Sequence, residues 1–298
     1  MPESILWKIL PESLKESLRN WVRQTAGMNS AQMLAKLYEP LDLAQEPDLL
    51  FFDAKEFTRS RTETTLGDIP VPAGSLRKGY GKTPEEFVQL AKNTASMLRV
   101  VMKDRKLVFS SGTAMLDWGC ATGRVLQEFR QEAGVAEFWG TDIDGTAIAW
   151  AKEQLSPPFH FVTCTVYPHL PFEDRKFSFI YGGSVFTHIR YLEDFWLMEL
   201  NRILRPGGTM VFTVQNEDTI QWFRDNYIGP RRIPREFDLD RLIAHDQVYL
   251  AGDDWAGELT FFKSSWIRKA WGRYFDVVDI KPAAEGFQTA VVLAKRDK

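Results

Sequence analysis

Ala114-Met-Leu-Asp-Trp-Gly-Cys-Ala-Thr-Gly-Arg124 is the stretch that decides the fold, and Phe138-Trp-Gly-Thr-Asp142 follows it. This order is typical of a strand, a glycine turn, a helix start and a second strand that ends in an acid. Gly119 and Gly123 let the chain turn tightly and pass close to a ligand, where a side chain would collide with it. Asp142 ends the second strand, where an acid accepts hydrogen bonds from ribose hydroxyls. The pattern therefore predicts a nucleotide-type pocket.

The glycine turn differs from the dinucleotide fingerprint, because Asp117 precedes its first glycine and the glycines are spaced differently. A dinucleotide needs a helix N-terminus aimed at pyrophosphate, whereas S-adenosylmethionine carries an ammonium group that an acid near the turn can hold. Here the chain resembles the class I, Rossmann-like S-adenosylmethionine-dependent methyltransferases of the bacterial small-molecule type, whose first motif is an acid followed by a Gly-x-Gly-x-Gly loop. Ala121 stands where the middle glycine is usual, so we expect a narrower loop that still allows close approach.

The remaining elements predict a Rossmann-like, doubly wound α/β sheet that is mostly parallel and closes with a C-terminal antiparallel hairpin. Thr83-Pro84-Glu85-Glu86 is a helix-start signal, and Asp144 is an expected helix cap. The expected strands are 114–118, 138–141, 159–163, 176–182 and 209–214, with the hairpin at 275–282 and 286–295. The expected helices are 84–102, 124–132, one that starts after Asp144, and 191–204, which the Arg205-Pro-Gly-Gly208 turn follows.

Two parts are expected in the chain: an N-terminal helical arm over 1–82 and a methyltransferase domain over 83–298. Helical spacing at 11–37 predicts two short helices, and the chain up to residue 82 is then broken by prolines and glycines. An insertion at about 215–270 is too long for a simple crossover and is the expected acceptor lid. Its aromatic and arginine side chains can bind an aromatic, glycosidic or anionic molecule, or pack on one another.

The amino-acid composition limits the kinds of partner that the protein can bind. The 298 residues are 44% hydrophobic, enough for a full core, and the net charge of -3 provides no field that would attract nucleic acid. The basic run at 231–235 is either a solvated loop or a site for an anionic substrate. Cys120 and Cys164 lack metal-ligand spacing, and no signal-peptide pattern or bilayer-length apolar run occurs. We expect a cytoplasmic protein with no membrane span and no metal.

The resemblance implies a set of contacts with the cofactor. Asp117 holds the methionine part, the loop backbone runs beside the cofactor, and Gly183 lies near the methionine end. Family members often have an acid after the third strand for adenine, but Thr165 and its neighbours stand there, so backbone groups or the Thr165 hydroxyl take that contact. Arg77 and Tyr80 either close over the cofactor or belong to a linker. The expected cofactor-binding residues are Tyr80, Asp117, Gly119, Cys120, Ala121, Gly123, Arg124, Asp142, Ile143, Thr165, Val166 and Gly183.

The resemblance also implies the chemistry, with S-adenosylmethionine as methyl donor and S-adenosylhomocysteine as product. Methyl transfer is an in-line displacement in which the enzyme positions the reactants and excludes water. A hydroxyl acceptor needs a base, and His188 and Tyr181 are the nearest candidates beyond the fourth strand. A histidine at this place can equally orient the next helix.

The motif Asn/Asp-Pro-Pro-Tyr, which amide and nucleobase amino methylation tends to use in this fold, is replaced by Tyr181-Gly-Gly-Ser. We therefore expect O-methylation of a small-molecule or glycan hydroxyl. Two alternatives remain: a protein of the same fold that binds the cofactor without turnover, and an NAD-dependent oxidoreductase. The acid-first glycine loop and the terminal hairpin disfavour the oxidoreductase.

Overall fold

The computed structural model describes residues 15–16, 62–189, 192–226, 238–250 and 259–297. The two helices predicted within 11–37 lie outside these residues, apart from the helical pair at 15–16. The basic run at 231–235 lies outside them as well. The boundary predicted at residue 82 stays a prediction.

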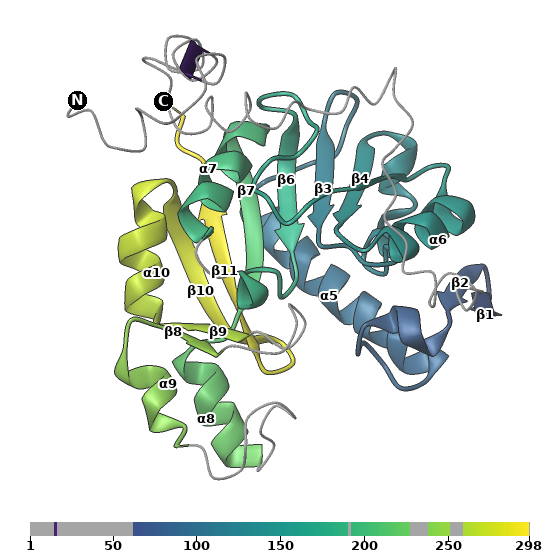
Figure 1. Cartoon of the computed structure of the whole chain (residues 1–298). Helices are drawn as coiled ribbons and strands as arrows, with labels where there is room; N and C mark the ends of the chain where they lie inside the picture. The colour runs from purple at the N-terminus through teal and green to yellow at the C-terminus, as the bar shows by residue number, and fades with distance from the viewer. Residues whose placement is uncertain (1–14, 17–61, 190–191, 227–237, 251–258, 298) are drawn as a thin grey trace.

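A seven-stranded sheet forms the centre of the molecule, in the order β10-β11-β7-β6-β3-β4-β5 (Figure 1). The strands from β7 to β5 are parallel, whereas β11 pairs antiparallel with both β7 and β10. This confirms the predicted, mostly parallel sheet with a C-terminal antiparallel hairpin. The bounds are β3 (Ala114–Trp118), β4 (Glu137–Asp142), β5 (His160–Thr163), β6 (Phe177–Gly182), β7 (Leu204–Val214), β10 (Asp276–Glu285) and β11 (Gln288–Ala294).

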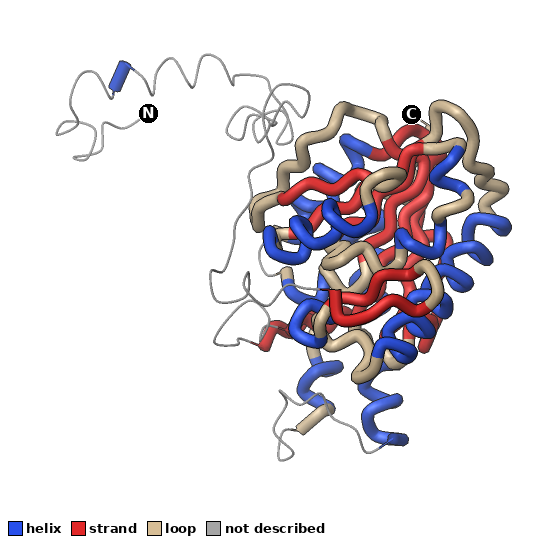
Figure 2. The backbone as a smooth tube through the Cα atoms, turned by 90° about the vertical axis from the view of Figure 1, so that its right-hand side faces the viewer, coloured by secondary structure: helices blue, strands red, loops and turns tan. Residues whose placement is uncertain are grey.

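Helices cover both faces of the sheet, and Figure 2 shows them flanking the strands. The first face packs against α7 (Glu193–Ile203) and α10 (Ser264–Ala270), and the second against α5 (Pro84–Asp104) and α6 (Gly145–Leu155). Because side chains alternate along a strand, Trp118 at the end of β3 packs on the first face. Its neighbour Asp117 is directed to the second face.

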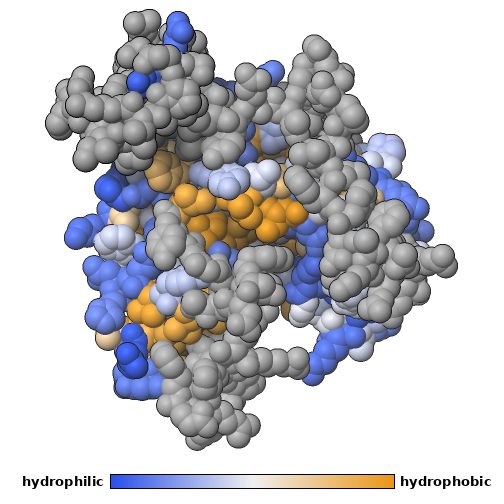
Figure 3. All heavy atoms as spheres, viewed as in Figure 1, coloured by the Kyte–Doolittle hydropathy of each residue, from blue (hydrophilic) through white to orange (hydrophobic). Residues whose placement is uncertain are grey.

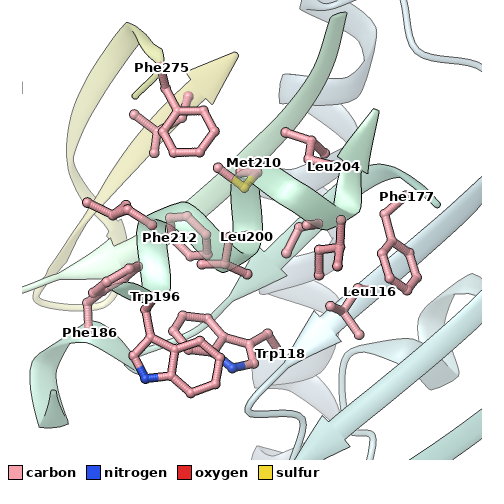
Figure 4. Close-up of a cluster of buried hydrophobic side chains, with 14 of the residues drawn as sticks. Leu116, Trp118, Phe177, Phe186, Trp196, Leu200, Leu204, Met210, Phe212 and Phe275 are labelled. Carbon is pink, nitrogen blue, oxygen red and sulfur yellow. The ribbon is translucent and has the colours of Figure 1, made fainter. Parts of the chain in front are cut away.

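The aromatic residues of the first face form one packed cluster, which Figure 4 draws together with the aliphatic side chains around it. The ring centroids of Trp118 and Trp196 lie 4.8 Å apart, and those of Trp118 and Phe186 lie 5.3 Å apart. All three side chains are almost fully buried. Aromatic pairs at such spacings add stability beyond the area they bury. The cluster therefore holds the end of β3 and the loop after β6 in fixed positions.

Both predicted helix starts have the expected caps. The Thr83 hydroxyl accepts a hydrogen bond from the Glu86 backbone N–H at 3.3 Å, and α5 follows. Asp144 Oδ1 accepts hydrogen bonds from the N–H groups of Thr146 and Ala147 at 2.9 and 3.0 Å, so α6 begins where the sequence predicts it. These side chains satisfy donors that the first turn of a helix leaves without partners.

Two local predictions need correction. The helix expected at 124–132 is replaced by the short 3-10 turns η2 (Leu126–Phe129) and η3 (Glu132–Gly134). Arg99 from α5 donates to the Glu128 carbonyl, which an α-helix would use internally. The turn expected at 205–208 lies inside β7, because Gly207 and Gly208 exchange backbone hydrogen bonds with Lys295 and extend the ladder.

The predicted lid region holds α8 (Glu217–Asn226), α9 (Asp240–Ala244), β8 (Gln247–Leu250), β9 (Leu259–Phe262) and α10, and β1 (Thr62–Leu66) and β2 (Ile69–Pro72) precede α5. Several of its aromatic residues pack on one another: the rings of Trp222 and Phe223 both contact Phe287 of the hairpin.

Figure 3 shows hydrophobic atoms gathered near the middle of one face of the molecule. None of the helices described here is long and apolar enough to span a bilayer.

Candidate functional site

A cavity of about 910 Å³ lies at the carboxyl ends of β3, β4 and β6. The strand order reverses between β3 and β6, and such a reversal is where open α/β sheets bind their ligands. We call this space the main cavity. The predicted site residues that line it are Tyr80, Gly119, Ala121, Asp142, Ile143, Thr165, Val166, Gly183 and His188.

A much smaller cavity of about 30 Å³ adjoins the main cavity, and we call it the side chamber. The two spaces share Tyr80, Gly119, Ala121 and Gly183 in their linings. The predicted residues that line the side chamber alone are Asp117, Cys120, Arg124 and Tyr181. Gly123 lines neither space, and its φ of +73° beside the Phe161 ring shows that it shapes the loop.

Asp142 ties the end of β4 to the glycine loop. Its Oδ2 atom accepts a hydrogen bond from the Ala121 N–H at 2.7 Å, and its Oδ1 atom accepts one from the Asp144 N–H at 2.9 Å. Burial raises the pKa of Asp142, and these two backbone N–H groups oppose that shift. Because each carboxylate oxygen can accept a second hydrogen bond, Asp142 still fits a pair of ribose hydroxyls.

Asp117 is the most perturbed carboxyl group of the site. It is 2% exposed, and burial raises its pKa to about 8 although the Arg124 guanidinium opposes this shift. Within the part of the chain that the structure describes, no hydrogen bond reaches its carboxylate. A buried carboxylate without such partners is costly, and a cationic ligand group would relieve that cost. The site therefore fits an ammonium group at Asp117.

Two glycines of the site, Gly119 in the glycine loop and Gly183 after β6, leave no room for a Cβ atom. A Cβ atom at Gly119 would collide with Val185 Cγ2, and one at Gly183 would collide with the Tyr181 hydroxyl. Ala121 has a φ of +48°, which lies in the left-handed region and costs on the order of 1 kcal/mol for a residue with a Cβ atom. This strain explains why glycine is usual at that position, and the loop keeps the left-handed turn without it.

Comparison with known families agrees with this geometry. A family model described as a methyltransferase domain matches residues 116–212, which run from β3 through the glycine loop to β7. This part of the chain is therefore similar to a methyltransferase domain.

Individual relatives of this methyltransferase domain are distant. Malonyl-[acyl-carrier protein] O-methyltransferase of Enterobacter lignolyticus is 23% identical over 158 residues, which are 52% of this chain and 59% of the relative. Demethylmenaquinone methyltransferase of Staphylococcus aureus is 29% identical over 131 residues, which are 43% of this chain and 52% of the relative. The chain thus spans only about half the length of the curated relatives that it matches.

One solved structure shows the same methyltransferase fold. An S-adenosylmethionine-dependent methyltransferase from Clostridium acetobutylicum aligns with a TM-score of 0.50 and 15% identity, over 69% of this chain and 92% of that protein. At this level of identity the likeness concerns the fold alone. It agrees with the parallel sheet and antiparallel C-terminal strands of this chain.

The two candidate bases of the site differ in their surroundings. Tyr181 is 2% exposed and donates its hydroxyl to Glu285 Oε2 at 2.7 Å. Burial raises the Tyr181 pKa well above 10, and Glu285 raises it further, so the phenolate form is disfavoured. His188 belongs to η4 (Phe186–His188) and lines the main cavity. We therefore keep His188 as the proposed base and leave Tyr181 out of that role.

Thr165 is exposed at the rim of the main cavity, and its hydroxyl accepts a hydrogen bond from the Tyr167 N–H at 3.2 Å. The contact with adenine predicted for Thr165 and Val166 remains a prediction.

Several residues of the site escaped the sequence analysis. Glu285 lines the main cavity and Thr122 lines the side chamber. Lys78 forms an ion pair with Asp144 at the rim of the main cavity. The sequence around Glu285 shows only an acid before the hairpin turn at Gly286. A hairpin-tip acid is normally a solvated group, so no local signal would have found it. Its position depends on how the hairpin packs against α5 and β6.

Proposed function

We propose that this protein transfers a methyl group from S-adenosylmethionine to a hydroxyl group of a small molecule. The observation that carries this proposal is that the side chamber adjoins the main cavity. The side chamber contains the buried Asp117, whose carboxylate accepts no hydrogen bond from the described residues, and Asp142 borders the main cavity. Bound cofactor supplies a methyl group that its sulfonium already activates. Asp117 and Asp142 are the two acids that the sequence predicts for the cofactor, and both lie toward the carboxyl ends of neighbouring parallel strands.

The role of the chain in this reaction is positioning. Asp117 would hold the ammonium group of the cofactor, and Asp142 would hold its ribose. Gly119 and Gly183 line both cavities, and neither position has room for a Cβ atom. Fixing both reactants in line turns a bimolecular step into one that is effectively unimolecular. The packed aromatic cluster behind Trp118 keeps this part of the site rigid.

The remaining lining of the main cavity favours a neutral acceptor with an apolar body. Among the described residues, its charged groups are Lys78, Asp142, Asp144 and Glu285, with His188 as a further ionisable group. The apolar lining includes Val185, Ile189, Leu192, Leu259 and Phe287. Ser184, Gln215 and Gln288 add uncharged polar groups. Such a lining suits a hydrophobic molecule with one or two polar functional groups.

The names of the relatives support small-molecule methylation, and one of them names oxygen as the methylated atom. A sugar acceptor was the other expectation, and it remains a prediction. We assign His188 the role of removing the acceptor proton, because it lines the main cavity just beyond β6.

His188→Gln tests this role. We expect kcat for methyl transfer to fall on the order of 100-fold or more, the contribution of a positioned base, while the Kd for S-adenosylmethionine stays within about twofold. The matched control is His160→Gln, because His160 is exposed at the amino end of β5, away from the strand ends that form the cavity. Equal kcat values in wild type and His188→Gln would rule out His188 as the base.

The whole proposal is tested by calorimetric titration with S-adenosylmethionine and, separately, with NAD, followed by transfer of labelled methyl to a panel of neutral hydroxylated aromatics. Binding of S-adenosylmethionine alone, with labelled product, supports the proposal. Binding without any transfer favours the alternative of a cofactor-binding protein that has no turnover. Binding of NAD alone would contradict the proposal.

A further inference from the structure

Glu285 lines the main cavity and connects three separate parts of the chain next to the side chamber. Its Oε1 atom accepts a hydrogen bond from the Thr94 hydroxyl at 2.7 Å and lies 3.3 Å from Nη2 of Arg124. Its Oε2 atom accepts the hydrogen bond from Tyr181. The Glu285 side chain is only 14% exposed. Residues from α5, β6 and the glycine loop therefore fix this carboxylate of the C-terminal hairpin.

Arg124 is held from two sides. The Glu285 carboxylate lies beside its guanidinium, and the Tyr80 ring lies under it with the Arg124 Cζ atom 4.1 Å from the ring centroid. A second contact joins Nη1 of Arg124 to the Thr94 hydroxyl at 3.4 Å. A guanidinium has five N–H donors, so these contacts do not prevent it from binding a further partner. Because Arg124 lines the side chamber, its guanidinium can also donate to a ligand there.

The side chamber also contains a hydroxyl group without a partner. Thr122 is 1% exposed and lines the chamber, and in the described part of the chain its Oγ1 atom makes no hydrogen bond. A buried polar atom of this kind is destabilising unless a ligand or water completes it. The lining of the chamber thus includes a carboxylate, the guanidinium groups of Arg77 and Arg124, and a hydroxyl group. This combination is complementary to an α-amino-acid head, which carries one ammonium and one carboxylate group.

The charge balance explains why Glu285 is needed. Asp117 and Arg124 interact electrostatically, and without a second acid they would be the natural ion pair of the chamber. Such a pair would use the acceptor that an ammonium group needs and the donors that a carboxylate group needs. Glu285 lies beside the guanidinium as its acidic partner, so Asp117 stays available to an ammonium group and other donors of Arg124 stay available to a carboxylate group.

We propose that Glu285 is a positioning residue for the amino-acid head of the cofactor, which acts by holding Arg124 toward the head's carboxylate and away from Asp117. This inference rests on the proposed function, because it takes S-adenosylmethionine as the ligand. It makes the C-terminal hairpin part of the cofactor site. It also gives the site a preference for ligands that carry the zwitterionic head over ligands that carry only the nucleoside.

Glu285→Gln tests the inference with two probes, S-adenosylhomocysteine and 5′-methylthioadenosine. Both contain adenosine and a thioether, but only the first has the amino-acid head. We expect the Kd of the first to rise about tenfold or more in the variant, while the Kd of the second changes less than about twofold. If Glu285 had a merely structural role, the substitution would lower the affinity for both ligands equally, and that result would overturn the inference.

A double-mutant cycle with Arg124→Gln separates positioning from direct contact. Because Glu285 acts through Arg124, we expect Glu285→Gln to cause no further loss of S-adenosylhomocysteine binding once Arg124 is replaced. Additive losses would contradict the inference. Glu285→Asp, which keeps the charge on a shorter side chain, provides the same comparison if Glu285→Gln does not fold.

The outcomes for the inference and for the proposed function can be told apart. If the wild-type protein binds both probes and Glu285→Gln leaves their affinity ratio unchanged, the inference alone fails. If the wild-type protein binds neither probe, the cofactor assignment fails, and the inference fails with it.

Discussion

Asp117→Asn is expected to weaken S-adenosylmethionine binding strongly and at the same time to stabilise the protein without ligand at pH 8. The substitution keeps the shape of the side chain but removes the charge that would hold the ammonium group. We expect the Kd to rise on the order of 100-fold, because one charge-assisted contact contributes about 1.5–3 kcal/mol and a buried one lies at the upper end of that range. Calorimetric titration of both proteins measures this change.

The stability effect follows from the pKa of Asp117. The pKa is about 8 in the folded protein, far above the value of about 3.9 for an unfolded chain. The folded state therefore holds the proton more tightly, and wild-type stability falls as the pH rises from about 4 to 8. Asparagine does not ionise, so the stability of the variant should not fall in this way as the pH rises. Its advantage should grow to a few kcal/mol by pH 8, the order of magnitude that such a shift implies.

Guanidinium chloride unfolding at pH 5 and pH 8 measures the effect. The free energy of unfolding should fall less between these pH values in Asp117→Asn than in wild type. Cofactor binding gives a second readout, because an ammonium group next to Asp117 favours release of its proton. Wild-type affinity should therefore rise from pH 6 to pH 7.5. Identical pH dependence of unfolding in the two proteins would contradict the assignment of Asp117 as a buried, neutral acid.

Asp142→Ala is expected to weaken S-adenosylmethionine binding on the order of tenfold or more, because a charge-assisted hydrogen bond contributes about 1.5–3 kcal/mol. The structure adds a second consequence. The N–H groups of Ala121 and Asp144 both lose their acceptor, so the glycine loop and the end of β4 are no longer tied together. We therefore also expect a loss of stability of about 1–3 kcal/mol.

Two further variants separate these effects. Asp142→Asn keeps one side-chain oxygen, so it should retain part of the stability but lose much of the affinity. Asp144→Asn is the matched neighbour: it removes the charge that pairs with Lys78 while keeping a good helix cap for α6. Its affinity for the cofactor should stay close to wild type. An unchanged Kd in folded Asp142→Ala would remove Asp142 from the site.

The sequence alone was sufficient for the fold where neighbouring residues determine the backbone. Thr83 and Asp144 cap their helices through hydrogen bonds with residues two or three positions away, so local spacing predicts both helix starts. The parallel strands are short apolar runs between turn signals, and their order along the chain implies the sheet. The 3-10 turns at 126–134 were missed, because their form depends on a contact from α5.

The residues of the site also fall into two groups, those that the local sequence predicts and those that only tertiary contacts bring together. Asp117 and Asp142 were predicted from the motif that contains them, and Asp142 lies at the end of β4 as expected. The separation of Asp117 from the main cavity was decided by tertiary structure, because the pleat of β3 and the packing of Tyr181 and Arg124 around it create a side chamber. Glu285 lies 161 residues beyond Arg124 in the chain. No local pattern relates two residues at that separation, since only the packing of the hairpin on the sheet brings a carboxylate to the buried guanidinium and makes both part of one site.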